Sequence, residues 1–235
     1  MKRLILLIVT VMTVAGIAAQ PRLRQPEMYF GVQGGIMAST VAFYPKIEQI
    51  TPLTKTVLLS PTGGFVFRYN GQKYCGVQVE VNYIQRGWKE KGTQLVAGTT
   101  TEYSIDYTRK LHYIEVPFLM HLYFGSPQWR FIINAGPQIG YCVYDDEGSG
   151  DKHQTQTHQY DPITNRFDWG VAGGLGVCCR TKNCGLYQLE ARFSYSFGTL
   201  FANRTTDYFG QSNPMNLSIC LAWMWEFKRK NKQQQ

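Results

Sequence analysis

The segment YQLEARFSYSF, residues 187–197, alternates apolar and polar side chains from end to end. Its odd positions hold Tyr, Leu, Ala, Phe, Tyr and Phe, and its even positions hold Gln, Glu, Arg, Ser and Ser. Successive residues of a β-strand point to opposite faces, so a strand here has one apolar face and one polar or charged face. A helix would mix the two sets on every side. The segment therefore predicts a strand with an apolar side chain set on one face only.

The same period of two recurs along the chain and predicts eight strands. The composition agrees, because 14% aromatic residues and 23 glycines favour strands joined by turns. Ile132 is the one residue that breaks the pattern in its segment. Besides 187–197, the clear segments are 75–83, 111–124, 129–143, 168–177 and 216–227, and the weaker ones are 28–38 and 62–69.

The connections between these segments alternate in length. Three are short, at residues 70–72, 125–128 and 180–184. Four are long, at residues 39–61, 86–106, 145–166 and 198–214, with strand extension above the membrane expected for 99–107. Outer-membrane barrels have short periplasmic turns and long extracellular loops. The pattern therefore predicts extracellular long loops and, with an even strand number, two periplasmic termini.

The size of the side chains decides which face of the sheet meets lipid. Eight strands enclose an interior only wide enough for side chains. The apolar set is bulky and aromatic, whereas the polar set includes many glycines and serines, so only the polar set fits inside. We predict an all-β fold, an eight-stranded antiparallel up-and-down transmembrane β-barrel with a side-chain-filled lumen. The alternative is a soluble, lipocalin-like barrel with the faces reversed.

The two ends of the chain predict export and a short tail. Residues 1–19 read as a secretory signal peptide, with a basic start, an apolar middle and cleavage after Ala18 or Ala19. The alternative, a membrane anchor, needs a longer apolar run. Residues 20–227 form the barrel, and residues 228–235 a basic periplasmic tail. The formal charge of +8 could indicate a nucleic-acid partner, but an exported protein meets none, so membrane lipid and lipopolysaccharide are the expected partners and nucleic acid is not.

The polar strand faces carry ions of both signs, which would be costly to bury unpaired. We expect them to form a salt-bridge network that plugs the lumen, with a proton or ion path as the alternative. The expected members are Arg68, Glu80, Glu115, Arg130, Asp168, Glu190, Arg192 and Glu226. The expected aromatic girdles at the membrane interfaces comprise Tyr83, Trp88, Tyr123, Trp129, Tyr141, Trp169, Trp223 and Trp225.

The remaining chemical signals are weak. Cys179 and Cys184 flank a short hairpin and could form a disulfide, while no CxxC or HExxH spacing predicts a metal or a cofactor. One predicted loop is rich in carboxylates and imidazoles, which suits a solvated loop or, alternatively, a rim hydrolase or acyltransferase. Its residues are Asp145, Asp146, Glu147, Asp151, His153, His158 and Asp161.

Two consecutive motifs resemble a known family. LHYIEVPF at 111–118 and FIINAGPQIG at 131–140 are similar to strands of the PorT-like, porin-family outer-membrane barrels of Bacteroidetes, as are GGLGV at 173–177 and residues 189–197. Within LHYIEVPF, Pro117 lacks an N–H and should break the ladder locally. The resemblance implies a non-enzymatic accessory or scaffold of type IX-like protein secretion, with other envelope secretion proteins as partners. A small passive pore, a surface adhesion barrel and a rim enzyme are the alternatives.

Overall fold

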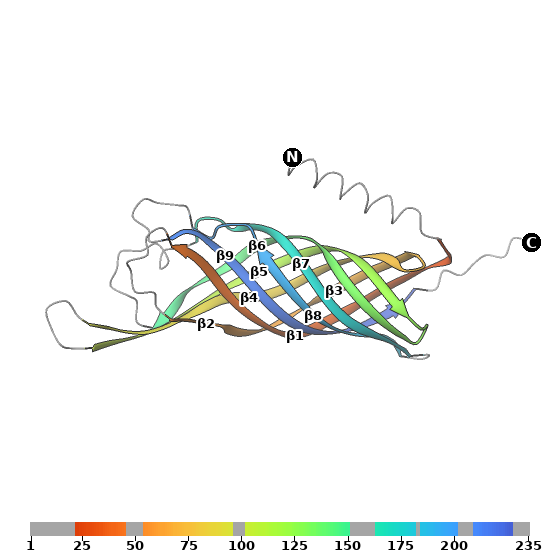
Figure 1. Ribbon diagram of the computed structural model, residues 1–235, viewed down its shortest axis with the longest axis horizontal. Coiled ribbons are helices and arrows are strands. Elements are labelled where there is room, and N and C mark those ends of the chain that lie inside the picture. Colours follow the sequence, from red (N-terminus) through yellow and green to blue (C-terminus); the bar gives the residue numbers. More distant parts are fainter. Residues whose placement is uncertain are drawn as a thin grey trace, which may run out of the picture.

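The computed structural model describes residues 22–45, 54–95, 102–150, 163–181, 184–201 and 209–227, which form one elongated antiparallel barrel (Figure 1). The expected signal peptide and basic tail lie outside these residues. In the described part of the chain, no helix has the length and hydropathy to cross a membrane. The strands are β1 Arg22–Pro45, β2 Thr54–Thr56, β3 Leu58–Gln72, β4 Cys75–Leu95, β5 Glu102–Gly125, β6 Trp129–Gly150, β7 Phe167–Thr181, β8 Gly185–Ser196 and β9 Phe209–Glu226.

The nine strands build an eight-stave barrel, as the sequence predicted. Only Val57 separates β2 from β3, and both pair antiparallel with β4, so together they make one stave. The sheet runs β4, β3, β1, β9, β8, β7, β6, β5, and a further pairing of β4 with β5 closes it. In this ring β4 lies diametrically opposite β8, and β1 lies opposite β6. Side chains from those pairs can therefore meet across the full width of the lumen.

The barrel has a short-turn end and a long-loop end. At the short-turn end, residues 73–74 join β3 to β4 and residues 126–128 join β5 to β6. At the long-loop end the strands extend past their predicted ends. The predicted loop 86–106 is therefore too long. Trp88 already pairs with Arg109, and the ladder continues to Leu95 and Glu102. The apolar alternation stops near Tyr83, but backbone pairing does not depend on it. Figure 1 shows the β4–β5 hairpin reaching beyond the other labelled strands.

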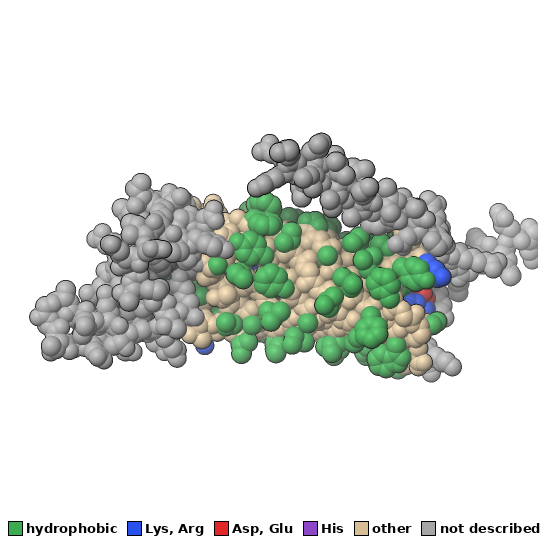
Figure 2. Space-filling model, viewed as in Figure 1, with side chains coloured by type: hydrophobic (Ala, Val, Ile, Leu, Met, Phe, Trp, Pro, Cys, Tyr) green, Lys and Arg blue, Asp and Glu red, His purple; other side chains and the backbone are tan. Residues whose placement is uncertain are grey.

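The outer wall is apolar and the interior is polar. Phe131 and Leu189 point outward and are 68% and 49% exposed. Glu190 follows Leu189, points to the opposite face and is 2% exposed. On the face seen in Figure 2, apolar side chains are spread over the wall between the two ends. On β5 this belt runs from Ile114 to Phe124. Ten steps of about 3.3 Å along a strand tilted by about 40° give a height of about 25 Å, the apolar band of an outer-membrane barrel.

Inward glycines allow the narrow barrel to close. A Cβ added to Gly31 would lie 2.0 Å from the carbonyl oxygen of Trp223, and one added to Gly170 would lie 2.2 Å from that of Tyr195. At these positions neighbouring backbones approach too closely for any side chain. Pro117 marks a local break in the pairing of β5. The β4–β5 ladder is interrupted between the Val79–Phe118 and Asn82–Glu115 pairs, where proline supplies no N–H.

Candidate functional site in the barrel lumen

A carboxylate–guanidinium pair spans the centre of the lumen. Arg192 of β8 donates to Glu80 of β4 through Nη1 to Oε2 at 2.6 Å and Nη2 to Oε1 at 2.7 Å. Its Nε donates to Glu190 at 2.8 Å. Such a bidentate pair fixes geometry as well as charge. Gln33 at 2.7 Å and Asn82 at 2.8 Å also donate to Glu80. The Glu80 side chain is buried, and both of its oxygens accept hydrogen bonds.

A second ionic layer lies nearer the long-loop end. Arg86 of β4 donates to both Glu115 of β5 and Asp168 of β7. Ser196 adds a 2.6 Å hydrogen bond to Asp168, and the guanidinium lies 4.8 Å from the centre of the Tyr113 ring. Arg86 is 1% exposed. One buried cation thus holds two carboxylates that would otherwise repel each other.

Arg68 is held by amides instead of carboxylates. It donates to the side-chain oxygens of Gln78, at 2.8 Å through Nε, and of Gln188. Gln188 in turn donates to Glu190 at 2.7 Å. These glutamines thus link the buried Arg68 cation, through hydrogen bonds, to the carboxylates of the central layer. Asn134 joins the same layer by donating to Glu190 at 2.7 Å.

The short-turn end has its own cluster. Arg130 of β6 reaches across the lumen to Glu27 of β1 at 2.9 Å, and Arg180 reaches the same carboxylate at 3.1 Å. Arg180 also pairs with Glu226. Tyr29 and Asn70 donate to Glu27 at 3.0 and 3.3 Å. The predicted residues Arg130 and Glu226 therefore meet only through two residues that sequence reasoning left out.

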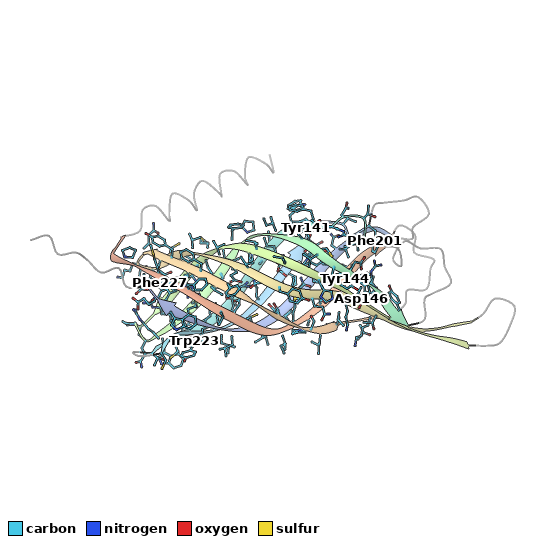
Figure 3. All side chains as sticks on the ribbon, turned by 180° about the vertical axis from the view of Figure 1, so that it is seen from behind. Tyr141, Tyr144, Asp146, Phe201, Trp223 and Phe227 are labelled. Atoms are coloured by element: carbon cyan, nitrogen blue, oxygen red, sulfur yellow. The ribbon has the colours of Figure 1, made fainter. Side chains whose placement is uncertain are left out.

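The long-loop end is closed by an aromatic cap around a cation. Arg109 pairs with Asp145 at 2.7 Å and lies 5.8 Å from the Trp88 ring centre and 5.6 Å from that of Phe201. The backbone N–H of Ile163 donates to Asp145 at 3.1 Å, which ties the segment before β7 to the mouth. Figure 3 places Phe201 at this end of the barrel and Trp223 and Phe227 at the other.

The described lumen is nearly balanced in charge and is filled along its length. An apolar cluster that includes Trp88, Leu111 and Phe201 lies toward the long-loop end, and a second that includes Tyr29, Ile132 and Met224 lies toward the short-turn end. Between and around them, seven described carboxylates accompany six guanidinium groups: Glu27, Glu80, Glu115, Asp145, Asp168, Glu190 and Glu226, with Arg68, Arg86, Arg109, Arg130, Arg180 and Arg192.

Two predicted girdle residues are wrong. Trp88 is fully buried and Tyr123 is 6% exposed, because both share the inward parity of their strands. Trp88 follows Arg86 by two residues, and the Tyr123 hydroxyl donates to the Gln72 carbonyl at 2.6 Å. The other predicted members are exposed on the outer wall: Tyr83, Trp129, Tyr141, Trp169, Trp223 and Trp225.

The disulfide interpretation is also wrong, since all six cysteines are free. Cys179 pairs with Tyr187 across the hairpin, three residues from Cys184. Three residues of strand span about 10 Å, whereas a disulfide needs Cα atoms about 4.4–6.8 Å apart. The register therefore keeps the two thiols apart.

The acidic segment is divided by the barrel wall. Asp145 faces inward to Arg109, while Asp146 is exposed. The side chain of Glu147 and residues Asp151, His153, His158 and Asp161 lie outside the described part of the chain. Among the described residues, no group of three His, Cys, Asp or Glu side chains is placed to hold a metal ion.

Comparison with known proteins gives one family match. The profile described as an outer membrane protein beta-barrel domain matches residues 18–202. No curated protein matches the sequence.

Among solved structures, the outer membrane protein OprG of Pseudomonas aeruginosa is similar at 12% identity and a TM-score of 0.49, over 86% of this chain and 96% of that one. Outer membrane protein W of E. coli is similar at 16% identity and a TM-score of 0.40, over 86% and 100%. Ail of Yersinia pestis is similar at 10% identity and a TM-score of 0.37, over 85% and 99%.

Proposed function

This chain belongs to the outer membrane protein beta-barrel domain family, and from that membership we propose that it is a non-conducting, non-enzymatic barrel that presents its rims to partners in the envelope. In this role the barrel is an anchor, and recognition takes place at its ends. The proposal places the short turns and both termini in the periplasm and the long-loop end outside the cell.

The proposal rests on one observation, which is that buried side chains occupy the lumen. Three guanidinium side chains, those of Arg68, Arg86 and Arg109, are at most 1% exposed inside the barrel. Arg68 and Arg86 each bind one partner on the neighbouring stave and one three staves away, Gln188 of β8 and Asp168 of β7, so these two contacts cross the space that a pore would need. A buried pair of this kind is costly to break, because the surviving partner is left as an uncompensated charge. The lumen is thus built to stay closed.

The pairing of the lumen charges also argues that the protein acts through its rims and not through its lumen. The carboxylates that an enzyme would use as acid or base are tied to arginines or amides. The β4–β5 hairpin, by contrast, extends the ladder to Leu95 and Glu102 beyond the apolar belt. Within the envelope, we infer an accessory or scaffold role in protein secretion from the likeness of residues 111–118 and 131–140 to PorT-like barrels.

Conductance tests the closed lumen. The purified protein in a planar lipid bilayer should give no steady current, and an Arg86→Ala variant that still folds should give more openings than the parent. Steady conductance of the unaltered protein would replace the anchor with a small passive pore.

Affinity purification of the native, detergent-solubilised protein tests the secretion role. Recovery of secretion components, together with loss of secretion on gene deletion, is the expected result. Deletion that leaves secretion intact but changes host binding would instead support surface adhesion, which the protruding β4–β5 hairpin favours as the second candidate.

A further inference from the structure

The outer wall of β4, β5 and β6 changes from apolar to polar within two residues at the long-loop end. Tyr83, Ile114 and Tyr141 pair across the three strands, and the exposed Val143 continues the apolar residues of β6 by one further position. The next row pairs Gln85 with His112, and His112 with Tyr144. Figure 3 shows Tyr141, Tyr144 and Asp146 following one another along β6 toward this end. This row therefore lies where the hydrocarbon ends and the headgroups begin.

His112 is fixed at this boundary by its neighbours. Its Nδ1 lies 2.5 Å from the hydroxyl oxygen of Tyr83, and its Nε2 lies 3.5 Å from the Gln85 amide nitrogen. The Tyr83 and Tyr144 ring centres lie 5.9 and 5.5 Å from the imidazole centre. The result is a platform of two exposed phenol rings and an imidazole, with polar atoms at its edge.

Two lysines lie farther along the same outward rows. Lys110 is the next outward residue after His112, and Lys89 is the second after Gln85, beyond Gly87. Lys89 pairs with Thr108, so the two lysines are diagonal neighbours on the sheet, within reach of a common ligand. Asp146 pairs with Lys110 from the β6 side and is the described carboxylate of the patch. The described patch therefore has a net positive charge.

The patch occupies one side of the rim. At a comparable height, the described outward positions hold Leu59 on β3 and Ala38, Thr40 and Ala42 on β1. Among these four side chains only Thr40 has a hydrogen-bond donor, and none is charged. Two of the described outward cations near this end, Lys89 and Lys110, are therefore neighbours on β4 and β5, while the exposed Arg166 lies just before β7. A pair of neighbouring cations suits a localised ligand better than a ring of general headgroup contacts.

We propose that Lys89, Lys110, His112, Tyr83 and Tyr144 form a binding site for lipopolysaccharide, with the lysines on its sugar phosphates and the phenol rings against its sugars. The site rests on the proposed orientation, which puts the long-loop end in the outer leaflet. Ammonium groups near a phosphate form charge-assisted hydrogen bonds, and an aromatic ring with a polar edge suits a membrane interface. A diglucosamine headgroup carries both the phosphates and the sugar faces that this patch can contact.

Binding of purified lipopolysaccharide to the detergent-solubilised protein tests the site. The variant Lys89→Gln/Lys110→Gln should bind about 30-fold more weakly than the parent, and Lys110→Gln alone about fivefold more weakly. Lys73→Gln removes the same charge at the short-turn end, where Nζ lies 5.0 Å from the Tyr74 ring centre, and should bind like the parent. Dephosphorylated lipopolysaccharide and phosphatidylglycerol vesicles should both bind the parent more weakly.

Each contrary result overturns a different statement. Unchanged binding by the double variant, or equal binding of dephosphorylated lipopolysaccharide, removes the site. Phosphatidylglycerol that binds as tightly as lipopolysaccharide shows a general anionic surface in its place. A loss confined to Lys73→Gln reverses the orientation and with it the proposed function, while conductance still tests the closed lumen separately. Unchanged circular dichroism of each variant shows that the barrel is intact.

Discussion

Arg192 and Glu80 join opposite walls of the barrel. They lie on β8 and β4, four staves apart in either direction around the ring, and their two parallel hydrogen bonds measure 2.6 and 2.7 Å. Arg130 and Glu27 make the equivalent contact between β6 and β1 at 2.9 Å. Backbone pairing fixes only neighbouring staves. The closed ring of eight staves already places these walls opposite each other, and the cross-lumen contacts tie them together through the interior.

The central pair gives the first prediction. Arg192→Met should lower the free energy of unfolding by about 3–5 kcal/mol, because it leaves Glu80 buried and charged without its partner. Glu80→Met/Arg192→Met should lose less than the sum of the two single variants, since neither ion is then stranded. Urea unfolding in lipid vesicles measures both. Arg166→Gln removes an exposed guanidinium and is the control. Additive single effects would contradict the coupling.

The Arg86 layer gives the second prediction. Arg86→Met leaves Glu115 and Asp168 facing each other in the lumen, so the variant should be among the least stable of the buried-charge variants. Adding Glu115→Gln and Asp168→Asn should restore much of the lost stability, because the repelling charges are gone. Thermal unfolding followed by circular dichroism measures the order. A triple variant no more stable than Arg86→Met would show that packing, and not charge, dominates this layer.

The third prediction concerns closure of the barrel. Gly31→Val should block the β1–β9 seam, since a Cβ at Gly31 would meet the Trp223 carbonyl oxygen at 2.0 Å. Gly173→Val is the matched control on the outer wall, where a Cβ meets nothing within 4 Å. The folded fraction after dilution from urea into lipid vesicles should fall for the first variant only. Equal folding of both would mean that the seam can relax.

The sequence predicts the fold well because it depends on a local rule. Alternation divides residues 187–197 into two faces, the bulk of the apolar set assigns that face to lipid, and Glu190 is 2% exposed on the inward face as these rules require. The same rule, extended past the apolar belt, would have placed Trp88 and Arg86 inside with Glu80. Both were missed as lumen residues because the predicted strand stopped at Tyr83, where the outward residues cease to be apolar.

The partners of the lumen ions could not be predicted in the same way. Arg86 meets Asp168 from a stave three places away, and this depends on barrel shear and on the height of each residue. Neither quantity is visible in a local pattern. Glu27 was missed because the weak alternation at 28–38 hid the start of β1 at Arg22.

The last prediction tests the hairpin register through the cysteines. Cys184 is exposed, whereas Cys75, Cys142 and Cys178 are buried, and a buried thiol cannot reach a reagent in water. A water-soluble maleimide should therefore label Cys184 rapidly in folded protein in vesicles, and Cys184→Ser should remove that rapid phase. Prior reduction should not change the amount of rapid label, because Cys179 lies too far along its strand to protect Cys184 as a disulfide. Rapid labelling that appears only after reduction would show that the two cysteines are bonded, which requires the β7–β8 hairpin to shift its pairing by several residues.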